Sequence, residues 1–276
     1  MKATGAVLPK VLVSAALLAV ALSMVSPLLF MLSSSFKSSA EVFSAPLQLV
    51  PSRPYLGNYA TILHHEYYFR WYLNSVIVVA MSVLLRGFFV SLAAYAFARL
   101  RFRGREVMFL ALLGTMMIPY DTTIVARFLM YKYLGIIDTL WAIILPAAFD
   151  VFFIFMMRQF FKGIPFELSE AALLDGCSHF RIFVRIVMPL AVPALLTMTL
   201  FTLIWVWNDF VNPYVFISSI RSETVTVGLQ YFQGRAGANY ALQMAGATFG
   251  VLLPLVLFVF NQRYFVQGIA TSGLKG

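Results

Sequence analysis

Six long apolar segments, separated by shorter polar stretches, make up most of the chain. Each is about 20 residues or longer, enough for a helix rising 1.5 Å per residue to cross a hydrocarbon core of about 30 Å. Strands of a membrane barrel would be about 10 residues long and would alternate in polarity, so helices fit the pattern better. The sequence therefore predicts an all-α, polytopic membrane protein with six transmembrane helices, forming a single domain over residues 1–276. The predicted spans are 11–32, 72–98, 107–130, 140–160, 190–217 and 241–260.

Composition supports this class. The chain is 61% hydrophobic and only 11% charged, with a mean hydropathy of +0.86, whereas soluble domains are about half apolar and a quarter charged. One cysteine, Cys177, excludes an internal disulfide. The net charge of +9 would suggest nucleic-acid binding in a soluble protein. Here the basic residues lie at span boundaries, so a membrane protein without a nucleic-acid partner is expected.

Basic residues at the span ends predict the orientation. Lys2 and Lys10 precede the first span, and the dense cluster "RLRFRGR" (99–105) follows the second. By the positive-inside rule both regions are cytoplasmic, and six spans then place both termini in the cytoplasm. The first segment exceeds the roughly 7–15 apolar residues of a signal peptide, so an uncleaved span is expected. The predicted location is a prokaryotic plasma (inner) membrane.

A polar stretch, "EAALLDGCSHFRIFVRIVMP" (170–189), interrupts the apolar sequence between the fourth and fifth spans. Pro165 is suited to open a short helix, Glu167 lies near its positive end, and Gly176 is suited to end it. Ser178 is suited to cap a second helix. The loop at about 161–189 is therefore predicted to be a helical elbow.

The second helix of this elbow is expected to be amphipathic. Its apolar positions follow the helical spacing i, i+3, i+4 and i+7: Phe180, Phe183, Val184 and Val187. Arg181 and Arg185 share another face. Two interpretations stay open at this point. A compact knob, with Ala171 and Ala172 permitting close approach, fits a groove on another protein, and an interfacial helical turn would lie on lipid headgroups.

The spacing of the elbow resembles a known motif. Glu170-Ala171-Ala172, three residues, Gly176, nine residues, Ile186 and, shortly after, Pro189 resemble the EAA loop of bacterial ABC-importer permeases. In that family the loop docks in a cleft of the cytoplasmic ATPase subunit. The resemblance implies that coupling to the ATPase involves Glu170, Ala171, Ala172, Asp175, Gly176, Ile186 and Pro189. Cys177 departs from the family's usual alanine, and both residues are small.

Further motifs extend the resemblance over essentially the whole chain: "NSVIV" (74–78), "MMIP" (116–119), "WND" (207–209) and "RYFVQGIATSGLKG" (263–276). Together they resemble the carbohydrate-uptake branch, similar to the six-span second permease subunit of maltose-type systems. The resemblance implies a homologous second permease, two ATPase subunits, an extracytoplasmic solute-binding protein and a sugar substrate. A glycerol-phosphate importer is an alternative within the family.

The chain itself has no G-x-x-x-x-G-K-[ST] motif with which to cradle ATP phosphates. We therefore expect no cofactor on this chain, no enzymatic activity of its own, and ATP with Mg on the partner ATPases.

Ionisable residues inside predicted spans indicate candidate functional positions, because burying them is costly. Arg86, Asp121 and Asp150 lie near mid-depth by residue count. One interpretation is a polar lining of the translocation path; the other is a buried Arg–Asp pair that fixes helix packing. Pro119, two residues before Asp121, is expected to break the third span.

The depth of each residue suggests which carboxylate pairs with Arg86. Arg86 lies roughly 21 Å into its helix, Asp150 roughly 15 Å from the same side, and Asp121 roughly 21 Å from the opposite side. Either could be reached by a long, snorkelling side chain. Asp150 is favoured, because no helix break precedes it.

The segment "WVWNDFVNPY" places Asn208 and Asp209 near the outer face. Aromatic rings beside amide and carboxylate groups are typical of sugar-binding sites, but an interfacial aromatic belt at a helix end fits equally well. The candidate translocation path therefore consists of Arg86, Asp121, Asp150, Asn208 and Asp209.

Other functional classes find less support. His64, His65 and Glu66 are adjacent in the long outer loop, but no further ligands at suitable spacing complete a metal site. No serine or cysteine has a plausible catalytic base beside it. An ion-coupled secondary transporter remains an alternative, although the chain lacks an evident inverted repeat, and a membrane scaffold would have no need of an EAA loop.

Overall fold

The computed structural model describes residues 7–44, 48–234 and 237–273. The chain divides into two compact units, Met1–Tyr68 with Leu229–Leu252 and Phe69–Gly228 with Leu253–Gly276. Helices dominate both, which confirms the predicted all-α class. A two-residue antiparallel pair, β1 (Gln233–Gly234) with β2 (Gly237–Ala238), is the exception among the described residues.

The first unit contains the N-terminal span and the loop that follows it. Its elements are α1 (Val7–Ser35), α2 (Gly57–Leu63), the 3-10 turn Leu229–Phe232, the β pair and the first part of α14 (Tyr240–Gly273). Buried Asn58 joins α2 to the end of α1 by donating to the carbonyl oxygens of Ser35 and Lys37, at 2.9 and 2.8 Å. The Tyr68 hydroxyl donates to the Gly246 carbonyl at 2.6 Å. The two bonds from Asn58 satisfy carbonyl groups at the end of α1, and the bond from Tyr68 ties this residue to the interior of α14.

Helix α1 is apolar on all sides, and its side chains from Lys10 to Leu29 are exposed within the chain. A helix that is hydrophobic all round belongs in a lipid or protein environment rather than in water. Its 26-residue apolar stretch Lys10–Ser35 is long enough to cross a membrane. The predicted first span therefore forms as a helix.

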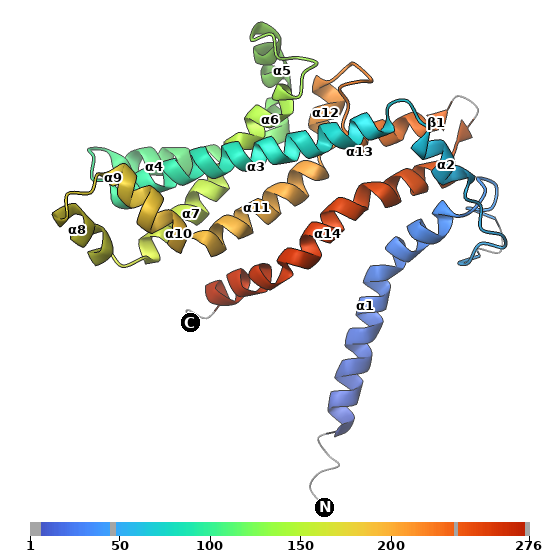
Figure 1. Cartoon of the computed structure of the whole chain (residues 1–276), viewed down its shortest axis with the longest axis horizontal. Coiled ribbons are helices and arrows are strands. Elements are labelled where there is room, and N and C mark those ends of the chain that lie inside the picture. Colours follow the sequence, from blue (N-terminus) through green and yellow to red (C-terminus); the bar gives the residue numbers. More distant parts are fainter. Residues whose placement is uncertain (1–6, 45–47, 235–236, 274–276) are drawn as a thin grey trace, which may run out of the picture. The chain divides into compact units, whose positions relative to one another are not determined.

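The second unit carries the second to fifth spans, the elbow and the part of α14 from Leu253 onward (Figure 1). It begins with α3 (Tyr68–Arg99), which is continuous for 32 residues. The further elements are α4 (Arg105–Thr115), the 3-10 turn Tyr120–Thr123, α5 (Ile124–Tyr133), α6 (Trp141–Ala148), α7 (Val151–Gly163), α8 (Glu167–Leu174), α9 (His179–Ile182), the π-helical turn Phe183–Val187, α10 (Met188–Leu190), α11 (Val192–Trp207), α12 (Val211–Phe216) and α13 (Val225–Gly228).

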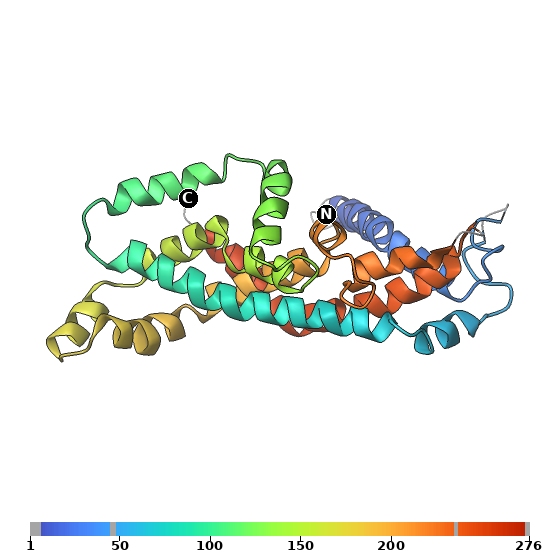
Figure 2. The same ribbon diagram turned by 90° about the horizontal axis from the view of Figure 1, so that it is seen from above.

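Bends interrupt two of the predicted spans. Among the described residues, four helices are long and apolar enough to cross a membrane, or up to six if each bent pair of helices is one span. The third span bends by 88° between α4 and α5, so that α5 stands steeply to α4 in Figure 2. Pro119 lies at this break, as expected from the loss of a backbone donor.

The fifth span differs more from the prediction. The helical segments before and after Ala191 meet at an angle of 77°, and α11 ends at Trp207 instead of continuing to residue 217. The chain turns at Asn208–Phe210 before α12 begins. Asp209 accepts hydrogen bonds from the backbone and side-chain nitrogens of Asn212, a local arrangement that competes with continuation of the helix.

The fourth span is also interrupted, between α6 and α7. Phe149 and Asp150 have extended backbone, with ψ of 113° and 118°. Asp150 then caps α7 by accepting a hydrogen bond from the Phe152 amide at 2.9 Å. This break places a carboxylate at a helix N-terminus inside an apolar segment, where the positive end of the helix stabilises it.

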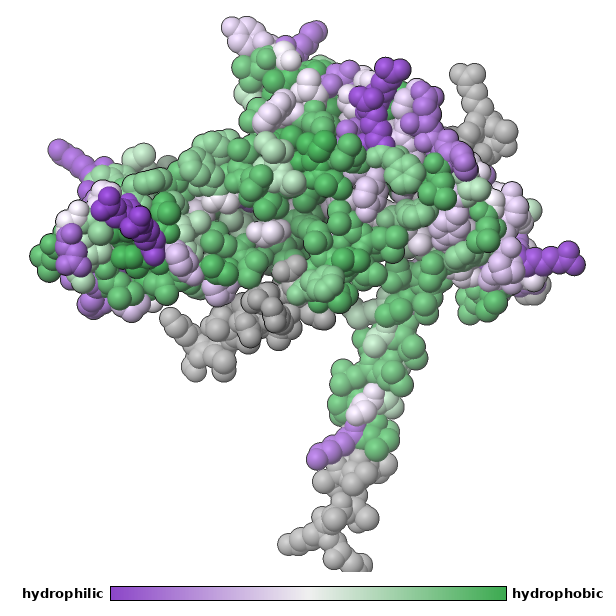
Figure 3. Space-filling view, viewed as in Figure 1, coloured by the Kyte–Doolittle hydropathy of each residue, from purple (hydrophilic) through white to green (hydrophobic). Residues whose placement is uncertain are grey.

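The core of the second unit lies where α3, α7 and α11 meet the elbow. Val90, Phe153, Met157 and Met198 are buried together with residues of the elbow. Figure 3 shows apolar residues along the middle of this unit, whereas charged side chains gather around α8 and α9 and beside α5. An apolar band with polar ends is the pattern expected of a membrane-spanning bundle.

Candidate functional site

A cavity of about 600 Å³ lies within the second unit, where the breaks of the third, fourth and fifth spans come together. Its wall combines the charged residues Arg86, Asp150 and Asp209 with aromatic residues including Tyr120, Phe152 and Trp205. Main-chain breaks at membrane depth are tolerated where they are buried in protein or line a cavity. The volume is in the range of small-molecule binding sites.

Arg86 is held at the wall of this cavity by partners on several elements. Only 4% of the surface of Arg86 is exposed. Its Nε donates to the carbonyl oxygen of Ala147 at 2.6 Å and its Nη1 to the hydroxyl of Thr202 at 2.9 Å. The guanidinium also lies over the Phe153 ring, 4.8 Å from its centroid. These contacts join α3 to α6, α7 and α11.

Asp150 is the ionic partner of Arg86. Its Oδ2 lies 3.6 Å from Nη2 of the arginine. This confirms the predicted pairing but not the reason for it, because the helix breaks at Phe149 and Asp150. The distance exceeds that of a hydrogen bond, and the carboxylate side chain keeps 25% of its surface exposed. Asp150 therefore balances the buried charge and still offers acceptor capacity to the cavity.

A second polar network surrounds the break in the third span. Arg127 donates from Nη1 to Asn212 Oδ1 at 2.8 Å, and its guanidinium lies 3.8 Å from the centre of the Tyr120 ring. Asn212 in turn donates from its side chain to Asp209 Oδ2 at 2.7 Å. Tyr120, Asp209 and Asn212 all line the cavity. The network joins the third span to the turn that follows α11.

The five candidate path residues do not all reach this cavity. Arg86, Asp150 and Asp209 line it. Asp121 is exposed on the 3-10 turn after Pro119 and does not line the cavity. Asn208 ends α11, where its side-chain amide donates to the Ile204 carbonyl of its own helix at 2.8 Å. Asp121 and Asn208 are therefore not part of the cavity wall.

Sequence reasoning missed Tyr120, Thr202, Trp205 and Asn212 as members of these networks. Each lies in an apolar or aromatic stretch with ordinary composition. Asn212 gave one usable signal, since it lies three residues after Asp209 and next to a proline, where side-chain–backbone bonding is common. Arg127 also belongs to these networks, through its contacts with Tyr120 and Asn212.

The elbow forms the two predicted helices. Helix α8 begins at Glu167, two residues after Pro165, and Gly176 follows its end with φ of +79°. Ser178 accepts a hydrogen bond from the Arg181 amide at 3.4 Å and so caps α9, as expected. The left-handed conformation at Gly176 is the one that glycine adopts without a steric penalty.

The buried face of the elbow differs from the predicted one. Phe183 and Val187 are buried as expected, but Phe180 and Val184 are 63% and 47% exposed, and Ile182 is buried in their place. A π-helical turn at Phe183–Val187 rotates the side chains relative to an α-helix. The periodicity of 3.6 residues is therefore the wrong template for this segment.

The residues of the EAA motif divide between the core and the surface. Ala172 is buried, and Ile186 and Cys177 pack against the same cluster. Glu170, Ala171, Asp175, Gly176 and Pro189 are exposed. Of the two alanines expected to permit close approach to another protein, only Ala171 is free to do so; Ala172 packs inside this chain.

The outer surface of the elbow combines apolar and charged side chains. Leu174 is 90% exposed, and Glu167, Arg181 and Arg185 are also exposed. Leu173 and Phe180 are exposed as well, and a group of exposed apolar side chains among charged ones is typical of a surface that contacts a partner. The elbow is thus anchored on one side and open on the other.

No cluster of three or more metal-binding side chains occurs in the described part of the chain. His64 contacts the Ala60 carbonyl at 2.8 Å through Nδ1, and the His65 ring packs against Phe232 at 5.1 Å. These histidines form part of the packing of the first unit.

Comparison with known proteins identifies relatives over most of the chain. Residues 87–271 match the family described as "Binding-protein-dependent transport system inner membrane component". The chain is 34% identical over 255 residues to the arabinooligosaccharides transport system permease protein AraQ of Halalkalibacterium halodurans, with 91% of each chain covered. It is 29% identical to the polygalacturonan/rhamnogalacturonan transport system permease protein YtcP of Bacillus subtilis, covering 94% of this chain and 96% of the relative.

A solved structure shares the fold. The crystal structure of a bacterial ABC transporter involved in the import of the acidic polysaccharide alginate superposes with a TM-score of 0.86, covering 96% of this chain and 99% of the matching chain at 24% identity.

Proposed function

Since the chain belongs to the family of binding-protein-dependent transport system inner membrane components, we propose that it forms the translocation path of a carbohydrate importer together with a second, homologous permease. Two separate ATPase subunits drive the cycle with ATP and Mg, and an extracytoplasmic binding protein delivers the sugar. The relatives named for arabinooligosaccharide and for polygalacturonan/rhamnogalacturonan transport support this substrate class. In the proposed orientation both termini and the EAA loop are cytoplasmic.

The EAA loop is the observation that carries this proposal. One side of it, through Ala172, Ile182 and Val187, is buried in the core of the second unit. Its other side presents Leu174 and Phe180 to the outside. A helix fixed to the bundle with an exposed apolar edge is suited to dock in a groove and to pass on movement.

The cavity suits a hydroxyl-rich substrate. Its charged lining consists of one guanidinium, Arg86, and two carboxylates, Asp150 and Asp209. Carboxylate acceptors beside aromatic rings such as Trp205 suit sugar hydroxyls and sugar faces. The proposal therefore prefers a sugar over a glycerol phosphate.

Reconstitution of the complete complex tests the proposal. The chain would be co-purified with its partner permease, ATPases and binding protein, and placed in proteoliposomes with ATP inside and labelled oligosaccharide outside. We expect uptake with ATP and none with ADP or without the binding protein. Uptake that follows an ion gradient in the absence of ATP would instead identify a secondary transporter.

A further inference from the structure

At the cytoplasmic ends of α3 and α7, an arginine of each helix donates hydrogen bonds to carbonyl groups at the end of the other. Arg99, in the last turn of α3, donates from Nη2 to the carbonyl oxygens of Phe161 and Ile164 at 2.6 and 2.5 Å. Arg158, in α7, donates from Nε to the carbonyl oxygen of Phe97 at 3.1 Å. The last carbonyls of a helix lack intrahelical partners and form its negative end. Each guanidinium thus satisfies the end of the other helix.

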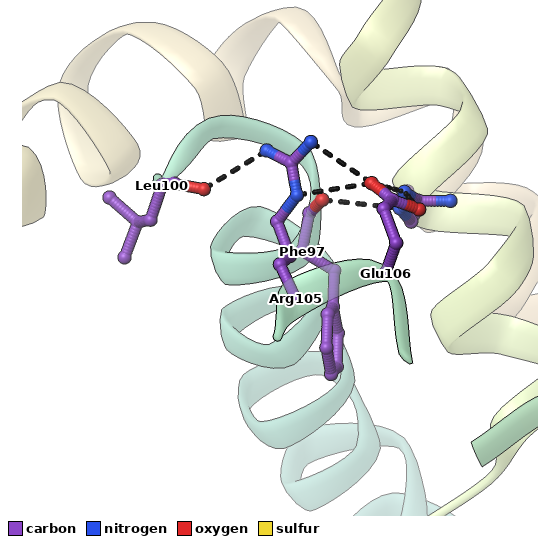
Figure 4. A network of polar contacts seen from close by, with 5 residues as sticks. Phe97, Leu100, Arg105 and Glu106 are labelled. Atoms are coloured by element: carbon purple, nitrogen blue, oxygen red, sulfur yellow. Dashed lines mark hydrogen bonds and ion pairs between the residues drawn. The ribbon is translucent and has the colours of Figure 1, made fainter. Parts of the chain in front are cut away.

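Glu106 extends this arrangement to α4. Arg158 Nη2 lies 2.8 Å from both carboxylate oxygens of Glu106, and its guanidinium lies 3.8 Å from the centre of the Phe109 ring. Arg105 holds the same carboxylate at 2.9 Å and bonds the Leu100 carbonyl at 3.1 Å (Figure 4). We call Arg99, Arg158 and Glu106 the arginine clasp. It fastens the ends of three helices to one another.

Burial makes the arginine clasp resistant to separation. Both arginines are buried, and breaking a buried guanidinium from its partners leaves an uncompensated charge. The arginines also fix rings on both sides, because Arg99 lies over Phe166 while Arg158 lies over Phe109. The three helix ends are therefore expected to move together.

The arginine clasp lies at the start of the EAA loop. Ile164, whose carbonyl it holds, comes three residues before the first residue of α8. The other end of the loop has no such fastening in the described structure; it leaves through the π-helical turn Phe183–Val187 and the 77° bend at Ala191. This end is held by apolar packing, with Val187 and Ala191 buried in the core, and not by buried arginines.

Helix α4 connects the arginine clasp to the cavity. Glu106 lies in its first turn, and Thr115, its last residue, lines the cavity beside Met116 and Pro119. We propose that the arginine clasp makes α4 and the entrance of the EAA loop one rigid body, so that displacement of α8 shifts the cavity wall at the break of the third span. This inference rests on the proposed function, and it assigns Arg99, Arg158 and Glu106 as positioning residues for transport.

The test compares coupling in assembled complexes carrying Arg99→Met, Arg99→Lys or the matched control Arg103→Met. Arg103 is exposed and lies four residues along the same cluster. The readout is the ratio of ATP hydrolysis with binding protein and sugar to hydrolysis without them. Arg99→Met is expected to lower this ratio about tenfold, with Arg99→Lys recovering most of it and Arg103→Met unchanged. A ratio for Arg99→Met within about twofold of the control would overturn the proposal.

A second measurement tests the rigid body in complexes that retain all the arginines of the clasp. Spin labels at Val107→Cys and Leu168→Cys, in a Cys177→Ala background, report the distance from α4 to α8 at rest and with ATP trapped. The proposal predicts the same distance in both states, while a label pair at Leu168→Cys and Tyr133→Cys, which spans the break, changes. Equal changes in both pairs would refute it. Wild-type complexes without any sugar-stimulated hydrolysis would instead contradict the proposed function.

Discussion

Arg86 shows how much a single residue contributes to the second unit. Its bonds to Ala147 and Thr202 and its pairing with Asp150 connect elements that are 61 or more residues apart in the sequence. Asp150 in turn caps α7. We propose that the pair stabilises one access state beside the sugar path. The carboxylate then has two roles, charge balance and helix capping, which mutations can separate.

A double-mutant cycle with Arg86→Met and Asp150→Asn tests this pairing. Asparagine keeps the cap but leaves the buried guanidinium without a counter-charge, so Asp150→Asn is expected to cost several kcal/mol, about 3. The double variant should be less destabilised than the sum of the single variants. Unfolding midpoints of purified protein, with uptake by the complex as a second readout, provide the cycle. Strictly additive effects would dismiss the pair.

Glu223 is a buried carboxylate outside the spans. Its Oε2 has no hydrogen-bond partner in the described structure. Burial, followed by the nearby Asp138, raises the pKa of Glu223 to about 7. The folded protein therefore holds this proton more tightly than the unfolded chain, and stability falls as the pH rises from about 4.5 to about 7.

Glu223→Gln should remove this pH dependence. The unfolding temperature of the variant minus that of wild type is expected to be higher at pH 8 than at pH 5. Each kcal/mol of this effect that remains after solvent screening corresponds to about 2–4 °C. Glu41→Gln is a control without pH dependence in this range, because hydrogen bonds from Ser52 lower the pKa of Glu41 and the carboxylate stays ionised in both states above pH 5. A difference for Glu223→Gln that is the same at both pH values would contradict the assignment.

Among the elements, the continuous helices were the most predictable. Length and hydropathy were sufficient to predict α1, α3 and α14, because a long apolar segment inside a membrane can satisfy its own backbone groups only as a helix. The break at Pro119 was also predictable, since proline removes a donor. The turn after Trp207 was not, because it depends on how Asp209 and Asn212 bond to each other.

The candidate site was predictable only in part, for a related reason. Residue counting along each helix gives depth, and depth placed both Asp150 and Asp121 within reach of Arg86. The choice of Asp150 was right, but it rested on an unbroken helix that the structure does not have. Depth does not give the direction in which a side chain points, so Asp121 and Asn208 were included although they do not line the cavity. The contact of Arg127 with Asn212 joins residues 85 positions apart, and no local pattern encodes it.

The π-helical turn of the EAA loop gives an element-scale prediction. Val187 is fully buried, whereas Val184, three residues earlier, is 47% exposed. Val187→Ala should lower the free energy of unfolding by about 2 kcal/mol through lost burial and a residual cavity, and Val184→Ala should change it by less than about 0.5 kcal/mol. Thermal unfolding of the two variants measures the difference. Equal effects of the two substitutions would instead support the regular amphipathic helix expected from the sequence.

At the scale of the whole molecule, we propose that this permease is moved by its partner ATPases. The cavity lies among broken spans, the EAA loop lies at a polar end, and α4 and the arginine clasp join the two. Gly176 is the position where the loop turns. No atom lies within 4 Å of a Cβ built at Gly176, so the restriction there is its φ of +79° and not lack of space.

Sugar uptake by complexes carrying Gly176→Val tests the central claim most directly. Gly163→Val is the matched control, since Gly163 also has open space around it but no positive φ. A β-branched residue at a left-handed position is strained by about 1–2 kcal/mol, and the shape of the loop must change. The account predicts that Gly176→Val abolishes ATP-driven uptake and weakens co-purification of the ATPase, while sugar binding by the binding protein and the behaviour of Gly163→Val stay normal. Uptake at the wild-type rate with Gly176→Val would contradict the claim that this loop couples the chain to its ATPase.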